Sequence, residues 1–291
     1  MTASGYAIWT WLPLALLTAA TPAATAPDVH VVKDLVYGKG GDVELKLDLA
    51  MPKDGPGPFP AIVCIHGGGW QKGHRGQLSE TIKVLASKGY VAATISYRLA
   101  PEHKFPAQIE DCKAAVQCLR ANAKAYRINP DRIGAMGFSA GGHLACLLGT
   151  TDRHDGLEGN GGHINQSSRV QAVVSFFGPT DFTQKTWSPE LEEKFFLPFL
   201  GARFDDRPDL YRRASPVSYA TKDDPPFLFF HGTEDKLVAI RHSRILATKL
   251  QAFNIDAQVI ALEGEGHGWR GEKLVQSFEQ MRRFFDEKLK H

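Results

Sequence analysis

The sequence lacks the features that would place it in several large classes of protein. Its basic residues form no concentrated run: 34 Lys and Arg stand against 32 Asp and Glu, a formal net charge of +2. Nothing in that balance favours nucleic acid or an anionic membrane surface as a partner. No internal repeat is visible. With 43% hydrophobic and 23% charged residues among 291, the chain has the composition and length for one well-filled globular domain.

Cysteine is also scarce, and its spacing matches no metal site. Cys112 and Cys118 fall on one expected helix, where their side chains point in different directions and cannot form a disulfide. A bond from either of them to Cys146 stays open. Because Cys64 lies within an apolar run, we expect free, buried thiols, and we expect neither a metal nor another cofactor.

No residue with a charged side chain precedes Asp28 in the sequence. An apolar block at residues 8–17 precedes a run of small residues at 18–26, the order typical of a secretory signal peptide, although its start carries no Lys or Arg. The block is too short and too interrupted by proline for a comfortable membrane span. We therefore predict a signal peptide at residues 1–26, cleaved between Ala20 and Ala26, and a secreted or periplasmic protein. An uncleaved anchor and a disordered tail stay open.

From residue 27 to 291, short apolar runs alternate with amphipathic stretches of helical length. This alternation predicts an α/β fold, a mostly parallel sheet with helices on both faces. The expected strands are Val29–Tyr37, Val43–Ala50, Pro60–Ile65, Val91–Tyr97, Arg132–Phe138, Val170–Phe177, Phe227–Phe230 and Ala257–Leu262. The expected helices are Gln77–Lys88, Ala107–Ala123, Ala140–Leu148, Ile240–Phe253 and Glu272–Leu289. The aromatic-rich segment 180–226 between two strands is expected to be a cap or a pocket wall.

The motif Gly137-Phe138-Ser139-Ala140-Gly141 lies between an expected strand and an expected helix. In that context a G-x-S-x-G sequence is typical of a nucleophile elbow, which holds the serine on a strained turn above the sheet. The flanking glycines are needed because the turn leaves no room for a Cβ atom. Ser139 is therefore the candidate nucleophile.

A second motif, His66-Gly67-Gly68-Gly69-Trp70, follows another expected strand. Consecutive glycines leave their amides unshielded, so that these amides can point at a substrate oxyanion. Amides of this glycine run, together with that of Ala140, the residue after the nucleophile, are the candidate oxyanion hole. His66 itself is expected to brace this loop.

Two later strands end in loops that carry an acid and a base. Asp235 follows the strand at 227–230, and His267 follows the strand at 257–262, so both should reach the sheet edge where Ser139 lies. The order Ser, Asp, His along the chain is that of α/β-hydrolases. His267 would accept the proton of Ser139, and Asp235 would orient the imidazole ring. Glu234 and Asp181 are rival acids.

These motifs, with Tyr97-Arg98-Leu99-Ala100-Pro101-Glu102, resemble the hormone-sensitive-lipase-like carboxylesterases. The chain resembles still more the bacterial feruloyl-esterase-like group called BD-FAE, from about Pro60 onward. The resemblance implies an α/β-hydrolase fold with an eight-stranded sheet and a triad of Ser139, Asp235 and His267. The same resemblance implies an oxyanion hole formed by the amides of Gly68, Gly69 and Ala140. It also implies an ester substrate, with acetyl or feruloyl groups of plant polysaccharides as the first expectation.

Aromatic residues near the motifs are expected to contact that substrate: Trp70, Phe138 and Trp269. Trp187, Phe195 and Phe196 could line the same cleft, although core packing is the simpler role for each of them. The alternatives are a general short-chain carboxylesterase, a peptidase on the same scaffold, and a binding protein without catalysis. The sequence marks no pocket for a peptide side chain, which favours the esterases.

Overall fold

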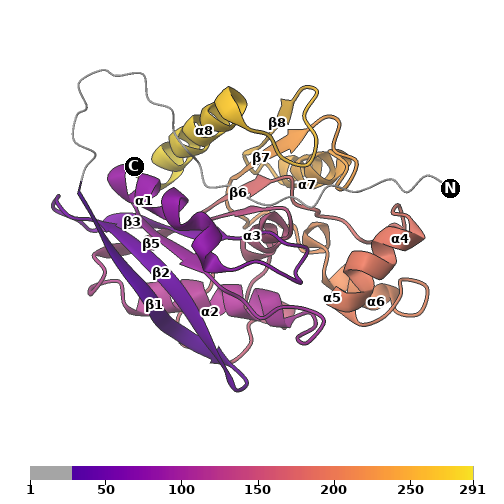
Figure 1. Ribbon diagram of the computed structural model, residues 1–291, viewed down its shortest axis with the longest axis horizontal. Coiled ribbons are helices and arrows are strands. Elements are labelled where there is room, and N and C mark those ends of the chain that lie inside the picture. Colours follow the sequence, from indigo (N-terminus) through magenta and orange to yellow (C-terminus); the bar gives the residue numbers. More distant parts are fainter. Residues whose placement is uncertain (1–27, 291) are drawn as a thin grey trace.

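The computed structural model describes residues 28–290, and the predicted leader lies outside them. A single eight-stranded sheet runs through the molecule in the order β1-β2-β4-β3-β5-β6-β7-β8 (Figure 1). The first two strands are antiparallel to their neighbours, and the other six are parallel. The bounds of β1 to β8 are, in order, Val29–Gly40, Val43–Pro52, Phe59–Ile65, Val91–Ile95, Ile128–Phe138, Ala172–Phe176, Phe227–Gly232 and Ala257–Leu262. The predicted fold class is confirmed.

Five longer helices cover this sheet, close to where the sequence pattern predicts them. They are α1 (Ser79–Ser87), α2 (Ala107–Ala121), α3 (Ala140–Thr150), α7 (Arg241–Ala252) and α8 (Gly271–Leu289). Short 3-10 turns occur at Arg75–Leu78, Arg153–Asp155 and Pro216–Ser218. Each connection between parallel strands thus contains helix. A connection of this kind has to cross the sheet to the starting end of the next strand, and a helix usually covers that distance.

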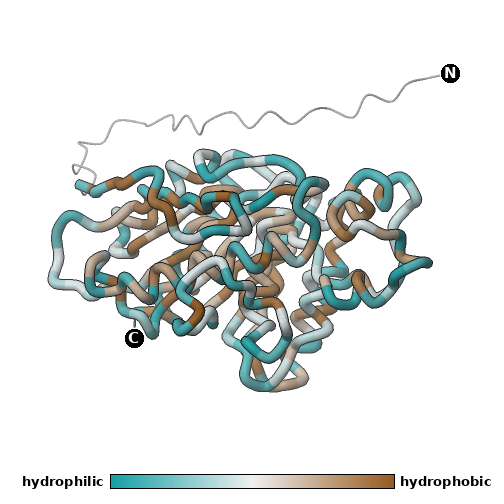
Figure 2. Tube along the Cα trace, turned by 90° about the horizontal axis from the view of Figure 1, so that it is seen from below, coloured by the Kyte–Doolittle hydropathy of each residue, from teal (hydrophilic) through white to brown (hydrophobic). Residues whose placement is uncertain are grey.

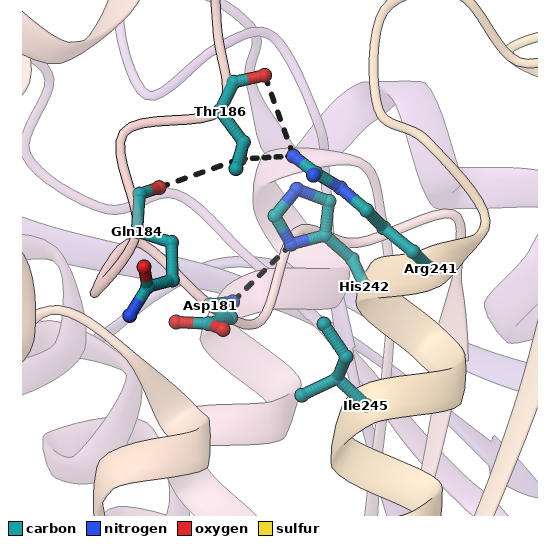
Figure 3. Close-up of a pocket in the computed structure, with 6 residues that line it drawn as sticks. All are labelled: Asp181, Gln184, Thr186, Arg241, His242 and Ile245. Carbon is teal, nitrogen blue, oxygen red and sulfur yellow. Dashed lines mark hydrogen bonds between the residues drawn. The ribbon is translucent and has the colours of Figure 1, made fainter.

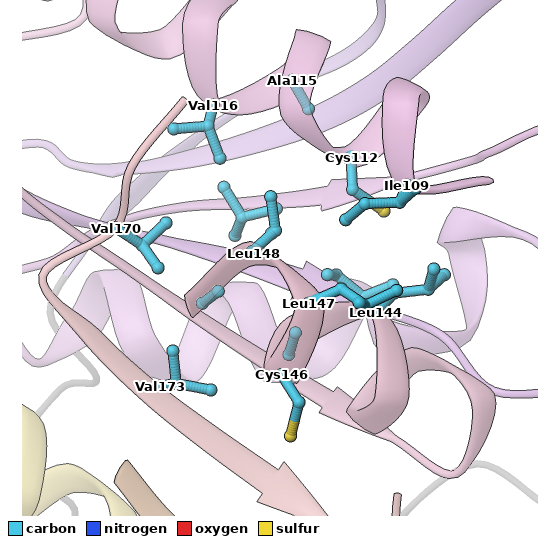
Figure 4. Packing of buried hydrophobic residues seen from close by; sticks show 14 of the residues in the cluster. Ile109, Cys112, Ala115, Val116, Leu144, Cys146, Leu147, Leu148, Val170 and Val173 are labelled. Atoms are coloured by element: carbon cyan, nitrogen blue, oxygen red, sulfur yellow. The ribbon is translucent and has the colours of Figure 1, made fainter. Parts of the chain in front are cut away.

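The hydrophobic core forms two layers, one on each face of the sheet, because successive side chains of a strand point to opposite faces. In β3, Val63 and Ile65 pack in the layer with α2, α3 and α7, whereas Ile62 and Cys64 pack in the layer with α1 and α8. Figure 4 shows the first layer between α2, α3 and β6. Figure 2 shows hydrophobic segments inside and hydrophilic loops at the periphery. Burial on both faces explains why the parallel strands read as continuous apolar runs.

The segment 180–226 folds into a cluster of short helices beside the sheet (Figure 1). It contains α4 (Pro189–Leu191), a π-helical turn (Glu192–Phe196), α5 (Leu197–Leu200) and α6 (Pro208–Arg213). The rings of Trp187 and Tyr211 stack within it, 5.5 Å apart and 8° from parallel. The aromatic residues of this segment therefore serve largely as its own core.

All four cysteines are free thiols and buried, as expected. Cys112 and Cys118 lie on α2, and burial raises the pKa of Cys112 well above its ordinary value. No helix within residues 28–290 is both long enough and apolar enough to cross a membrane.

Candidate active site

The chain makes a sharp turn between β5 and α3, and Ser139 is the residue at that turn. Its backbone lies in the left-handed region, with φ of 52°, which is strained for a residue with a side chain. A Cβ atom at Gly137 would lie 2.2 Å from the carbonyl oxygen of Gly141, and one at Gly141 would lie 2.2 Å from that of Ile65. Both flanking glycines are therefore required by backbone contact, and the serine side chain is held out above the sheet.

Ser139, His267 and Asp235 form one continuous hydrogen-bonded chain. Ser139 Oγ lies 2.8 Å from His267 Nε2, and His267 Nδ1 lies 2.7 Å from Asp235 Oδ2. Because a carboxylate can only accept, Nδ1–H donates to Asp235, and in the neutral ring Nε2 is left to accept the hydroxyl proton of Ser139. This is the tautomer that a general base for serine requires.

The Asp235 side chain is completely buried, yet it is held in its charged form. Burial by itself raises the pKa of this carboxyl, but hydrogen bonds from His231 and His267 outweigh burial and bring the pKa below its ordinary value. Its other oxygen, Oδ1, accepts the amides of Leu237 and Val238, both at 2.9 Å. The anion that orients His267 is thus fixed by donors on both oxygens.

The loops that carry the acid and the base are joined through their backbones. The amide of Glu234 donates to the carbonyl of Glu265 at 2.8 Å, and a Cβ atom at Gly232 would lie 2.2 Å from the same carbonyl oxygen. This contact explains why Asp235, rather than its exposed neighbour Glu234, faces His267. The other rival, Asp181, donates its backbone amide to His242 Nδ1 at 3.3 Å, and its carboxylate accepts the hydroxyl of Thr183 at 2.7 Å instead of a bond from His267.

The glycine loop after β3 lies against the nucleophile. A Cβ atom at Gly67 would be 3.4 Å from Ser139 Cβ. Gly68 and Gly69 have φ values of 114° and 61°, and their amides donate no hydrogen bond to any group within residues 28–290. The amide of Ala140, at the first turn of α3, also has no intrahelical acceptor. These three amides are thus available to a developing oxyanion, and their role in the hole stays a prediction.

A buried histidine connects this loop to the nucleophile helix and to the 180–226 segment. Trp70 Nε1 donates to His143 Nδ1 at 3.1 Å, and His143 Nε2 donates to the carbonyl of Ala214 at 2.7 Å. Burial lowers the pKa of His143 to about 4, which keeps the ring neutral and so able both to accept and to donate. His66, below the same loop, stacks on Tyr97 with ring centres 4.3 Å apart, which fits its expected bracing role.

The three aromatic side chains predicted to contact substrate are all buried, which corrects that expectation. Trp70 is 4% exposed and stacks on Phe199 at 4.2 Å, so its indole belongs to the core. Phe138 stacks on Phe176 at 4.6 Å and belongs to the core layer with α1 and α8. Trp269 donates through Nε1 to Ser277 of α8 at 3.0 Å, which anchors the loop of the base.

Three further residues lie near the site. The sequence patterns did not identify two of them and gave Phe195 only a possible place in the cleft. The half-buried Phe195 lies over Gly69, where a Cβ atom would come within 2.8 Å of its ring. The ring of Phe177 meets His267 edge-on at 4.7 Å, and His231 Nε2 lies 3.3 Å from Asp235 Oδ2. A histidine four residues before the acid, and an aromatic pair ending β6, are signals that could have drawn attention to His231 and Phe177.

No group of three or more His, Cys, Asp or Glu side chains within residues 28–290 is arranged to hold a metal ion. The site itself brings together a hydroxyl, an imidazole, a carboxylate and three backbone amides. That set fits nucleophilic attack on an acyl carbon followed by proton return to the leaving group.

Comparison with known proteins agrees with this arrangement. The family model BD-FAE matches residues 47–250. Esterase LipC of Mycobacterium tuberculosis (strain ATCC 25618 / H37Rv) is 34% identical over 239 residues, which are 79% of this chain and 58% of LipC. The chain spans about half the length of the curated relatives it matches, from 51% to 58%.

Among solved structures, a truncated carbohydrate esterase from gut microbiota superposes with a TM-score of 0.80 and 29% identity, covering 93% of this chain and 99% of that one. Esterase 2 of Thermogutta terrifontis, solved after phosphonylation by sarin, gives a TM-score of 0.76 and 28% identity, covering 90% and 96%. Both similar structures are thus esterases.

Proposed function

The chain belongs to the BD-FAE family of α/β-hydrolase esterases, and from that premise we propose that it hydrolyses carboxylic esters through an acyl-enzyme on Ser139. The observation that carries the proposal is the unbroken chain from Ser139 Oγ through His267 to Asp235, at 2.8 Å and 2.7 Å. The neighbouring esterase phosphonylated by sarin supports it, because organophosphonates react with activated serine hydroxyls.

In the first half of the reaction, Ser139 Oγ attacks the ester carbonyl carbon as its proton passes to His267 Nε2. The carbonyl electron pair moves onto oxygen, which faces the amides of Gly68, Gly69 and Ala140. When this intermediate collapses, the bond to the alcohol oxygen breaks and Nε2–H returns the proton to the leaving alcohol. The Asp235 carboxylate offsets the positive charge that His267 carries between these two transfers.

In the second half, a water molecule takes the place of the alcohol. His267 Nε2 removes a proton from the water as its oxygen attacks the acyl carbon, and the amides again face the oxyanion. The bond to Ser139 Oγ then breaks, and Nε2–H returns the proton to Oγ. The products are a carboxylic acid and the restored hydroxyl.

The decisive variant is Ser139→Ala, which removes the nucleophile and only one oxygen atom. Ester hydrolysis should fall by about 10⁴- to 10⁶-fold while the circular dichroism spectrum and the thermal unfolding midpoint stay near those of the unmodified protein. A fluorophosphonate probe should label the unmodified protein and leave the variant unlabelled. Wild-type turnover by the alanine variant would refute the proposed nucleophile.

Within this class we propose acetyl or feruloyl groups of plant polysaccharides as the substrate. The similarity to a carbohydrate esterase supports this choice, and a general short-chain carboxylesterase is the second candidate. Rates on p-nitrophenyl acetate, methyl ferulate and acetylated xylan discriminate between the two. Activity on p-nitrophenyl acetate alone would favour the second candidate.

We also propose that the protein is exported, on the strength of the uncharged apolar leader at residues 1–26. Expression of the full chain in a bacterial host, followed by mass determination of the secreted or periplasmic product, tests this. A new N-terminus between Ala20 and Ala26 is the expected result, and an intact chain confined to the cytoplasm would contradict it.

A further inference from the structure

A small cavity lined mainly by charged and polar residues lies near the candidate active site, between the loop after β6 and the first turns of α7. It measures about 70 Å³, and its lining residues are Asp181, Gln184, Thr186, Arg241, His242 and Ile245 (Figure 3). Because one water molecule needs about 10–15 Å³ of such space, the cavity has room for several hydroxyl-sized groups of a larger molecule.

The cavity holds an unused donor that is set in a fixed position. His242 is 8% exposed, and its Nδ1 accepts the amides of Thr180 and Asp181, both at 3.3 Å. Since burial lowers the pKa of this ring to about 4, it is neutral and carries its proton on Nε2. Nε2 has no hydrogen-bond partner among residues 28–290, and Figure 3 shows the ring at the centre of the lining residues.

An acceptor and a second donor face the same space. Asp181 uses Oδ1 for the amide and hydroxyl of Thr183, which leaves Oδ2 for a ligand. The Arg241 guanidinium is held by the hydroxyl and carbonyl oxygens of Thr186, contacts that occupy only one of its nitrogens. One carboxylate and one guanidinium together give the cavity no net charge.

This balance of donors and acceptors identifies the chemistry of the ligand. A free anion would meet the Asp181 carboxylate, and an acyl chain would leave the free Oδ2 of Asp181 and Nε2 of His242 without hydrogen-bond partners. Neighbouring hydroxyl groups, which both donate and accept, match the carboxylate, the guanidinium and the imidazole N–H together.

The position of the cavity connects it to the reacting groups. Asp181 follows Phe177, whose ring touches His267, by four residues, so their Cα atoms are at most about 14 Å apart. On the other side, Ser243 Oγ of α7 lies 2.7 Å from His231 Nδ1, and His231 contacts Asp235. The cavity is therefore fixed to the same framework as the triad and lies within reach of an extended substrate bound there.

We propose that this cavity is a subsite for a neutral sugar residue on the alcohol side of the scissile ester. The hydroxyl groups of the sugar form hydrogen bonds with Asp181, Arg241 and His242. This inference rests on the proposed ester hydrolysis and makes it specific, because it predicts discrimination between esters that carry a sugar and esters that do not. Small aryl esters lack the hydroxyls that the cavity binds.

The test compares an acetylated xylo-oligosaccharide with p-nitrophenyl acetate. The measured quantity is the ratio of the two kcat/KM values, for the unmodified protein and for Asp181→Asn and Arg241→Gln. The asparagine keeps the Oδ1 that Thr183 needs, removes the charge and replaces the free acceptor Oδ2 by an NH2 donor. Because hydrogen bonds to charged groups are lost, the ratio should fall about 10- to 100-fold in each variant, chiefly through KM for the oligosaccharide. Arg244→Gln is the matched control, because Arg244 is exposed on the same helix and lies outside the cavity. This variant should keep the kcat/KM ratio of the unmodified protein.

An unchanged ratio in both cavity variants would overturn the subsite, as would an equal fall in Arg244→Gln. Hydrolysis of p-nitrophenyl acetate without hydrolysis of the oligosaccharide by the unmodified protein would also overturn it, while leaving the esterase proposal intact. Failure to hydrolyse either ester would remove the proposed function itself, and the subsite with it.

Discussion

Three buried histidines make the fold sensitive to acid, and the size of the effect follows from their burial. His66, His143 and His242 are 1%, 0% and 8% exposed. Burial lowers the pKa of each ring from 6.5 to about 4, because charging an imidazole inside the protein is unfavourable. In the unfolded chain the same rings are in water and take up protons as the pH falls below 6.5.

The unfolded state therefore binds more protons than the folded state between pH 6.5 and 4, and stability must fall as the pH falls through that window. Between pH 7 and pH 5 the unfolding free energy falls by about 2 kcal/mol for each ring, or by about 6 kcal/mol for the three. Because domains of this kind are stable by only about 5–15 kcal/mol, the loss is a large part of the total.

Urea unfolding followed by circular dichroism, at intervals from pH 7 to pH 5, measures this loss directly. His143→Gln should lower stability at every pH, because the contacts with Trp70 and Ala214 change, but it should reduce the loss between pH 7 and pH 5 by about 2 kcal/mol. His163→Gln, an exposed histidine outside the core, is the control for removing any histidine. A change of less than about 1 kcal/mol for the unmodified protein over this range would refute the reasoning.

Three further predictions concern the site and the thiols. Asp235→Asn should lower kcat by about 10⁴-fold without unfolding the protein, because the amide favours the wrong tautomer of His267; a loss below about tenfold in steady-state kinetics would contradict this. Gly69→Ala should lower kcat/KM by about 10²-fold or more, since the new methyl group meets the Phe195 ring at 2.8 Å, and adding Phe195→Ala should restore part of the activity if that contact is the cause. Ellman's reagent should find the four thiols unreactive in the native protein and reactive in guanidinium chloride, and fast labelling of the native protein would show that they are not buried.

The sequence predicts the framework well because periodicity and backbone chemistry are local. Apolar runs identify all eight strands to within a few residues, and the glycines around Ser139 predict a turn that the backbone contacts require. The arrangement of Asp235 and His267 follows from strand ends that share one sheet edge. The chain order of acid and base was thus enough to identify Asp235 and His267, whose Oδ2 and Nδ1 atoms lie 2.7 Å apart.

The surroundings of the site are less predictable because they depend on which way a side chain leaves the backbone. Trp70 was expected in the cleft, but its backbone, with φ of 60°, turns the indole into the core. Phe195 comes from a distant segment and reaches Gly69 only through the packing of the short helices. No pattern within either stretch of sequence contains that information, since it depends on contacts between segments far apart in the chain.

The hydrogen bond from Trp269 to Ser277 has a practical consequence for anyone who modifies the C-terminus. His267 follows β8, one of the two edge strands of the sheet, and the indole two residues later fixes its loop to α8. Deletions or fusion tags that disturb α8 would weaken the contact that positions the loop of His267, although α8 lies far along the chain from Ser139. Purification handles are therefore better placed at the other end of the protein, after the predicted leader.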